Sequence, residues 1–296
     1  MPTAFPDAAR IDVPASLATE LLKGAECLPR YANKDFYSPD LQTLVSGRVR
    51  EACPDGFDWI VSAVREKIAR RPYCAVVRGL RFDDGNRLFV ALNRAFGELV
   101  ARPYEAPRAQ LVHYVQPSTD IASARGGHES ERLHTDTADW PIPVELISMV
   151  CVRADQGGGG RSQVLDVDTI RNEVKDHLGA QTLELLQSEP VPWQVAAYCG
   201  GGLTWRTVLT KSSLCWRRYT ITLAEESEGA TITAEMREAL DAFEDLVSGS
   251  ESKVEFLMRE GDLLFSDNYR TIHARTPISN GVTSDRLMIR SWIRTS

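Results

Sequence analysis

The stretch Glu131-Arg132-Leu133-His134-Thr135-Asp136-Thr137 places a histidine and an aspartate two positions apart. On a β-strand, side chains two residues apart project from the same face. An imidazole nitrogen and a carboxylate oxygen on one face supply two ligands for a divalent metal ion. We therefore predict a metal site at His134 and Asp136, on or beside a strand, with a third ligand elsewhere in the chain.

The composition is that of an ordinary globular protein. The chain has 296 residues, of which 43% are hydrophobic and 25% charged, which suits one large domain with a sizeable core. The net charge of −7, from 34 Lys and Arg against 41 Asp and Glu, argues against a nucleic-acid or anionic-membrane partner. We expect a small-molecule partner, and the sequence does not indicate the oligomeric state.

The sequence shows no targeting or membrane segment. Its start lacks a basic region followed by an apolar run, and no apolar stretch approaches the roughly 18 residues of a membrane-spanning helix. The six cysteines are scattered without a Cys-x-x-Cys pair, which indicates reduced thiols. We expect a cytoplasmic protein.

Residues 1–105 are predicted to form a helical shoulder that packs against a sheet. Apolar residues at helical spacing predict helices over Ala15–Lys23 (capped by Gly24), Asp58–Arg71 and Gly85–Leu99. The apolar run Tyr73–Leu80 predicts a strand, and the proline-punctuated stretch Pro29–Pro54 predicts irregular structure. Nothing in this third of the chain requires a catalytic role.

Residues 106–296 contain many short apolar runs separated by Gly and Pro turns, a pattern typical of β-rich folds. The predicted strands are Leu111–Gln116, Glu145–Val152, Gln163–Val167, Val191–Tyr198, Leu203–Leu209, Trp216–Leu223, Val254–Met258, Asp262–Ser266, Thr271–Ala274 and Leu287–Arg294. The predicted helices are Asp168–Leu178, Ala180–Gln187 and Thr233–Val247, the last with Thr231 or Thr233 as N-cap. We predict a mainly β fold with flanking helices and a double-stranded β-helix (jelly roll, cupin-like) core, within a single domain spanning 1–296.

Two loops stand out in this part of the chain. The small-residue loop Ser118–Gly127 leads to the His-x-Asp stretch, and loops of this kind often cover a site. Four glycines at 157–160 could suggest a phosphate cradle. No Gly-Lys-Ser/Thr follows them and no helix is predicted to begin there, so a P-loop is not indicated.

The third ligand candidate is His273, in the segment Asp267–Arg275. Two histidines and one carboxylate that leave open positions make the facial triad of non-heme Fe(II) oxygenases. Arg286 and Arg290 follow, four residues apart, so on a strand both side chains share one face. A guanidinium pairs bidentately with a carboxylate and stays charged when partly buried. The two arginines could bind an anionic ligand or form part of a solvated strand face.

From about Tyr73 to its end, the chain resembles the Fe(II)/2-oxoglutarate-dependent dioxygenases of the taurine dioxygenase and clavaminate synthase-like superfamily. The resemblance rests on Leu133-His134-Thr135-Asp136, on Gly159-Gly160-Arg161-Ser162, and on Asp267–Arg275 with the Arg286–Arg290 tail. It implies a dioxygenase that consumes 2-oxoglutarate and O2, releases succinate and CO2, and oxidises an unactivated C–H bond by hydroxylation or desaturation.

The resemblance also implies a role for each site residue. The catalytic iron would be held by His134, Asp136 and His273. The far carboxylate of 2-oxoglutarate would pair with Arg286, assisted by the hydroxyl of Ser162, where relatives often carry Thr. Arg290 would lie near the substrate or the co-substrate. Related halogenases replace the ligand carboxylate by a small residue, so the aspartate of this chain argues against halogenation.

The substrate is expected to be a small polar molecule, an amino acid or an amino-acid-derived intermediate of specialised metabolism. Acidic side chains near the metal segment could bind its ammonium group and basic ones its carboxylate. Trp140 could pack on a substrate, although a core or lid position is the commoner role for such a residue. The candidate substrate residues are Glu129, Ser130, Asp139, Trp140, Arg161 and Arg275.

Two other functions stay open at this point. The first is a dioxygenase that scavenges a sulfonate or an aryloxyalkanoate, for which a basic pocket without acidic residues would speak. The second is a jelly-roll binding protein without catalytic activity, which the complete set of ligand candidates makes the less favoured.

Overall fold

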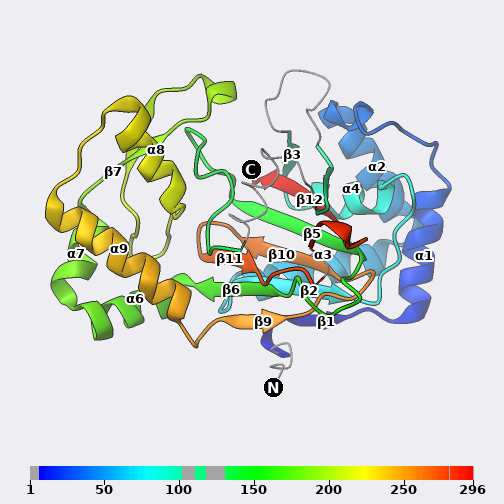
Figure 1. Cartoon of the computed structure of the whole chain (residues 1–296). Helices are drawn as coiled ribbons and strands as arrows, with labels where there is room; N and C mark the ends of the chain where they lie inside the picture. Colours follow the sequence, from blue (N-terminus) through cyan, green and yellow to red (C-terminus); the bar gives the residue numbers. More distant parts are fainter. Residues whose placement is uncertain (1–6, 102–110, 118–130, 280, 296) are drawn as a thin grey trace.

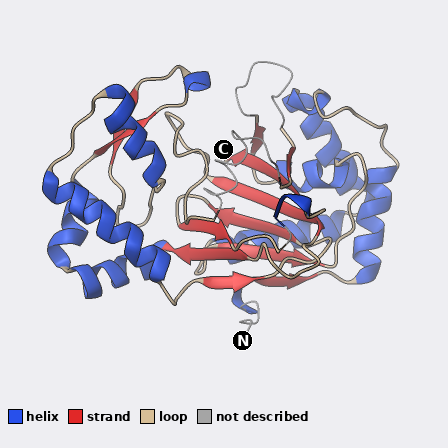
Figure 2. Cartoon of the chain, viewed as in Figure 1, coloured by secondary structure: helices blue, strands red, loops and turns tan. Residues whose placement is uncertain are grey.

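The computed structural model describes residues 7–101, 111–117, 131–279 and 281–295. The predicted loop 118–127 and the candidate residues Glu129 and Ser130 lie outside these ranges. Two β-sheets occupy the middle of the molecule, with helices on both sides of them (Figures 1 and 2). None of the helices in these ranges has the length and apolarity needed to cross a bilayer.

The larger sheet has seven strands in the order β1-β2-β10-β5-β12-β3, with β4 pairing to β12. β1 runs parallel to β2, and the other pairs are antiparallel. Its members are β1 (Arg10–Asp12), β2 (Cys74–Arg78), β3 (Glu98–Val100), β4 (His113–Val115), β5 (Leu146–Arg153), β10 (Leu263–Asp267) and β12 (Leu287–Arg294). Three of these strands come from the first 105 residues: β2 lies within the predicted strand Tyr73–Leu80, whereas β1 and β3 were not predicted.

The smaller sheet, β11-β6-β9, lies against the larger one. Its strands are β6 (Ser162–Asp166), β9 (Val254–Phe256) and β11 (Thr271–Arg275). Val76 and Leu264 of the larger sheet share a buried core with Val164 and Phe256 of the smaller one. The next residue along β2, Val77, belongs instead to the core on the outer face, as the two-residue period of a strand requires. The predicted jelly-roll core with flanking helices is thereby confirmed.

The helices α1 (Ala15–Glu26), α2 (Pro39–Ala52), α3 (Pro54–Ile68) and α4 (Arg87–Arg94) cover the outer face of the larger sheet (Figure 1). Helix α2 was missed, although Ser38 caps it, accepting a hydrogen bond from Leu41 N (3.3 Å). The prediction that Gly24 ends α1 was wrong. A Cβ at Gly24 would lie 2.7 Å from Ala52 Cβ, so this glycine lets α1 approach α2 closely.

A second helical lobe packs on the outer face of the smaller sheet (Figure 1). It consists of α6 (Val167–Glu173), a π-helical turn (Val174–Leu178), α7 (Ala180–Ser188), β7 (Val191–Gln194), β8 (Leu203–Arg206), α8 (Arg218–Glu228) and α9 (Ala234–Gly249). The short 3-10 turns of the chain are Asp7–Ala9, Asp35–Tyr37, Ala197–Cys199 and Gly281–Thr283.

The structure corrects one strand in this lobe and confirms one cap. Trp216–Leu223 was predicted as a strand from its aromatic and β-branched residues, but α8 covers most of it. Ile221 and Ala224 are buried three residues apart on one helical face, so burial overrides the local β preference. Thr233 caps α9 as predicted, accepting from Met236 N (3.1 Å).

Candidate active site

His134 is positioned by pairing with the edge of the smaller sheet. It forms an isolated antiparallel bridge with His273 of β11, in which each backbone N–H donates to the other carbonyl at 3.0 and 2.9 Å. The strand ends there, because Asp136 already lies in a turn and Thr137 has a φ of 55°. The predicted shared strand face is therefore wrong in detail. The turn, and not a continuous strand, directs Asp136 toward the two histidines.

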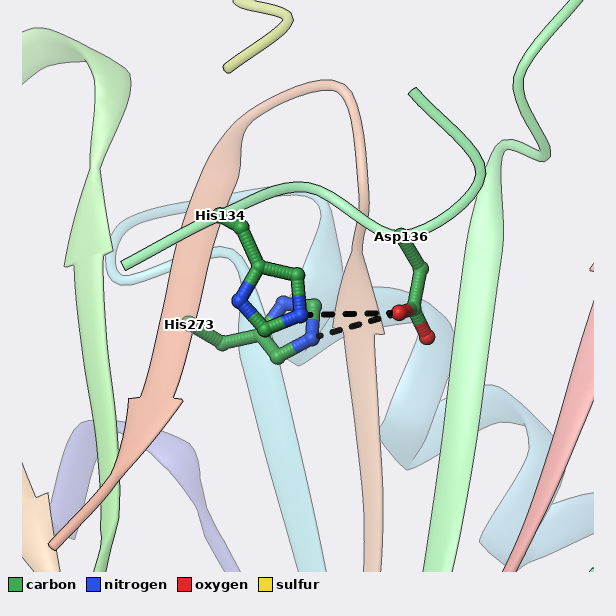
Figure 3. Close-up of side chains that lie close together, drawn as sticks. All are labelled: His134, Asp136 and His273. Atoms are coloured by element: carbon green, nitrogen blue, oxygen red, sulfur yellow. Dashed lines mark ion pairs between the residues drawn. The ribbon is translucent and has the colours of Figure 1, made fainter. Parts of the chain in front are cut away.

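Three side chains converge at this bridge (Figure 3): His134 and Asp136 are buried, and His273 is largely buried. Asp136 Oδ1 lies 3.7 Å from His134 Nε2 and 3.9 Å from His273 Nε2. Both distances are too long for hydrogen bonds. A metal ion with ligand bonds of about 2.0–2.2 Å bridges donors separated by up to about 4 Å. The donor set, two imidazoles and one carboxylate, fits a non-heme Fe(II) ion.

The protonation of these groups also suits a cation. His134 Nδ1 donates to the carbonyl of Arg132 (2.8 Å), which leaves the Nε2 lone pair facing the centre. Burial, together with the charges of His134, Arg290 and Arg217, lowers the pKa of His273 to about 3, although the charge of Asp136 acts in the opposite direction. This imidazole is therefore neutral at neutral pH, as a metal ligand must be.

Asp136 is kept ionised by its neighbours on β12. Burial alone would raise its pKa, but the guanidinium of Arg290 together with the two histidines holds the pKa well below its usual value. Arg290 Nη1 donates to both carboxylate oxygens at 3.1 Å, and Trp292 Nε1 donates to Oδ2 at 2.8 Å. In this structure Arg290 therefore contacts a candidate metal ligand.

Asn268 holds the backbone of Asp136, a contact that the sequence alone did not indicate. Its Oδ1 accepts from Asp136 N (2.9 Å), while its Nδ2 donates to the carbonyls of Asp136 and Val144, each at 2.9 Å. The side chain is fully buried. In the sequence, only its position between Asp267 and the strand that contains His273 could have indicated that Asn268 belongs to the site.

Arg286 is buried beside the glycine run 157–160. It is only 6% exposed, and its Nη2 donates to the carbonyl of Gly160 at 3.3 Å. Burial lowers the pKa of Arg286, and the nearby charge of Arg275 lowers it further. In the parts of the chain that the structure describes, no carboxylate forms an ion pair with this guanidinium. A buried cation without a counter-charge is costly, so this site favours an anionic ligand.

Arg275 lies close enough to Arg286 for its charge to act on the guanidinium, and Ser162 lies beside Arg275. They are register partners on β6 and β11, and they share the inner faces of these strands with Val164 and His273. Arg275 Nη1 donates to Glu131 Oε1 at 2.9 Å. The structure thus brings an acidic and a basic side chain together near the candidate metal centre.

Other predicted substrate residues are placed differently. Arg161 pairs with Glu255 at 2.7 Å, as does Gln163 at 2.9 Å, which puts them on the outer face of the smaller sheet. Trp140 is buried against Trp292, with ring centroids 5.4 Å apart, in a small core. Asp139 accepts from the hydroxyl of Tyr198 at 3.1 Å.

Arg217 is a further cation that the sequence did not single out. The preceding residue, Trp216, is bonded through its backbone to Thr135, and its ring packs on Phe243 in the core of the second lobe. The extended backbone of Arg217 (φ −163°) directs its side chain away from that core. Its Nε is buried and has no hydrogen-bond partner among the described residues.

Residues 58–292 match the protein family described as taurine catabolism dioxygenase TauD, TfdA family. The fold is similar to that of asparagine oxygenase in complex with Fe(II), 3-hydroxyasparagine and succinate (TM-score 0.72, 18% identity, 97% of this chain and 94% of that chain). It is also similar to the non-heme iron oxygenase OrfP in complex with Fe and alpha-ketoglutaric acid (TM-score 0.71, 18% identity, 99% and 95% covered). A further OrfP structure contains Fe, succinate and (3S)-hydroxy-L-Arg (TM-score 0.72, 18% identity, 97% and 94% covered). No curated protein matches the chain.

Proposed function

This chain belongs to the TauD/TfdA dioxygenase family, whose members' cofactors are Fe(II) and 2-oxoglutarate, and from that premise we propose that it hydroxylates or desaturates an amino acid at an unactivated C–H bond. The observation that carries the proposal is the pairing of two buried sites. One is the cluster of His134, Asp136 and His273, and the other is the site around Arg286, a cation without a carboxylate partner in the described structure.

In this proposal His134 Nε2, His273 Nε2 and a carboxylate oxygen of Asp136 would hold Fe(II). Three protein ligands leave positions open for the co-substrate and O2. When bound, the iron and 2-oxoglutarate supply the oxidising chemistry, with release of succinate and CO2. The role of the chain is to hold and orient the ligands: Arg290 and Trp292 fix the Asp136 carboxylate, and burial keeps His273 neutral.

Arg286 would bind the far carboxylate of 2-oxoglutarate, with the Ser162 hydroxyl beside it. A bidentate guanidinium–carboxylate pair would give this buried cation the counter-charge that it lacks in the protein alone. Burial of the pair would also strengthen it relative to a surface ion pair.

An amino-acid substrate is supported by two observations. Two structural neighbours contain hydroxylated amino acids, 3-hydroxyasparagine and (3S)-hydroxy-L-Arg. The side chains near the candidate centre are of mixed charge, as the Arg275–Glu131 pair shows, which suits a zwitterion. We assign the substrate carboxylate to Arg217, because its buried Nε still needs an acceptor.

The reaction class is tested by anaerobic titration of the metal-free protein with Fe(II) and then 2-oxoglutarate. We expect the weak visible charge-transfer band of an iron–2-oxoglutarate complex. Absence of this band despite bound iron would refute the proposal and leave a metal-binding jelly roll.

The substrate class is tested by measuring succinate release with the free amino acids and with taurine. Stimulation by an amino acid supports the proposal, whereas stimulation by taurine alone would favour sulfonate scavenging, the function suggested by the description of the family. Arg217→Gln should raise KM for the substrate without changing 2-oxoglutarate binding. The matched control is Arg218→Gln, since Arg218 pairs with Asp241 (2.8 Å).

A further inference from the structure

Asp155 joins two segments that both contact Arg286. It lies between β5 and the glycine run 157–160 and is 3% exposed. Its Oδ2 accepts from the backbone N–H groups of Gly159 (2.8 Å) and Ser279 (3.0 Å), and its Oδ1 accepts from the Ser284 hydroxyl (2.9 Å). The carboxylate therefore connects the glycine run to the segment that leads into β12.

Both connected segments contact Arg286 directly. The oxygen of Ser284 accepts from Arg286 N (3.3 Å), and the carbonyl of Gly160 accepts from the Arg286 side chain. Gly160 has a φ of 61°, and a Cβ there would lie 2.7 Å from Arg286 Nε. Gly160 N in turn donates to Pro277 O at 2.9 Å. The absence of a side chain at Gly160 therefore lets the backbone of the glycine run pass close to the Arg286 guanidinium. This close packing explains the glycine without a role in phosphate binding.

The donors to Asp155 are all uncharged. Asp155 forms no ion pair with Arg286 in the described structure: its three hydrogen bonds come from neutral donors, and its charge acts on the guanidinium only from a distance, raising the pKa of Arg286. An ion pair between the two would occupy the guanidinium and compete with an incoming ligand. The hydrogen bonds of Asp155 therefore hold the backbone segments around Arg286 and leave the guanidinium able to pair with an anionic ligand.

We propose that Asp155 is the positioning residue of the co-substrate site, holding the glycine run, Ser279 and Ser284 so that Arg286 faces the far carboxylate of 2-oxoglutarate. This inference rests on the proposed function, because it needs Arg286 to bind the co-substrate.

The test is the dissociation constant of 2-oxoglutarate, measured anaerobically from the charge-transfer band of the Fe(II)-loaded protein. We expect Asp155→Ala to raise this constant about tenfold or more, as loss of an outer-shell partner commonly does, while Fe(II) affinity changes less than about twofold. Ser284→Ala keeps the carboxylate and should raise the constant about threefold. Asp155→Asn should restore most of the affinity, because its oxygen can face the two N–H groups while its amide donates to Ser284.

The control is Asp262→Ala, which removes another buried carboxylate that accepts a backbone N–H (Arg259, 2.9 Å) but has no contact with Arg286. It should lower thermal stability and leave the 2-oxoglutarate constant unchanged. Wild-type affinity in Asp155→Ala, or an equal loss in Asp262→Ala, would overturn the role of Asp155. If Asp155→Ala does not fold, wild-type affinity in Ser284→Ala overturns it instead. Absence of the charge-transfer band in the wild-type protein would instead refute the proposed function. This result differs from every outcome that overturns the role of Asp155, because those outcomes concern the variants alone.

Discussion

The metal half of the site, formed by His134, Asp136 and His273, differs from the anion half around Arg286 in how its charge is balanced. Asp136 is buried but accepts three hydrogen bonds, two of them from a guanidinium. Arg286 is equally buried but donates to a single carbonyl and has no carboxylate partner in the described structure. The carboxylate of the first half already has charged and polar partners before any ligand arrives, whereas the guanidinium of the second half gains an ion-pair partner only with an anion. Replacing residues in each half should therefore affect different measurements.

The largest effect is expected in the metal half. Loss of an outer-shell partner costs about 10–100-fold in metal affinity or activity, and His134→Ala, which removes a direct ligand, should cost more. The variant should bind Fe(II) weakly and develop no charge-transfer band with 2-oxoglutarate. The matched control, His177→Ala, removes an exposed histidine and should behave as wild type. A wild-type band in His134→Ala would show that the iron lies elsewhere.

The next effect separates the two halves. Arg286→Met should raise the dissociation constant of 2-oxoglutarate by about 100-fold, because a buried charge pair is worth roughly 2–5 kcal/mol to binding. Fe(II) affinity should not change. The same variant should unfold at a higher temperature than the wild type without ligands, since it removes a desolvated cation. A lower melting temperature would mean that Arg286 already has a compensating partner in the protein.

A smaller effect concerns acid. The pKa of His273 is about 3 in the folded protein and about 6.5 when unfolded, so below pH 6.5 the unfolded state binds the extra proton. The free energy of unfolding of the metal-free protein should therefore fall as the pH drops from about 6.5, by up to about 1.4 kcal/mol per pH unit from this group. Asp136 acts at lower pH, because its contribution is lost only below its unfolded pKa of about 3.9.

Urea denaturation at pH 7 and pH 5 measures this dependence. His273→Asn should reduce the difference between the two pH values, because the substituted side chain does not titrate. Equal differences in wild type and variant would assign the acid sensitivity to other groups.

The sequence predicted best what short motifs encode. The strands β2, β5, β10, β11 and β12 and the convergence of His134, Asp136 and His273 followed from spacing, alternation and resemblance. The partners of these residues could not be predicted in that way. Asn268 and Trp292 reach Asp136 from 132 and 156 positions away, and only the folded chain sets which distant polar groups meet. Burial of one helical face likewise makes residues 218–228 a helix (α8), although their local sequence preference predicted a strand over part of this range.

The smallest effect is expected at Arg161, which we place outside both the metal half and the anion half of the site. Arg161 immediately precedes β6, and consecutive residues of extended backbone point to opposite faces, so Arg161 and Ser162 face in opposite directions. Arg161 therefore pairs with Glu255 on the outer face, where both side chains are partly exposed and the pair contributes about 0–1 kcal/mol. Arg161→Ala should change turnover less than about twofold, while Ser162→Ala, one position along, should weaken 2-oxoglutarate binding by several-fold. Steady-state succinate release with varied 2-oxoglutarate compares the two variants. A larger effect at Arg161 would mean that this arginine leaves Glu255 to contact the substrate, and the boundary of the site would then extend around the edge of the smaller sheet.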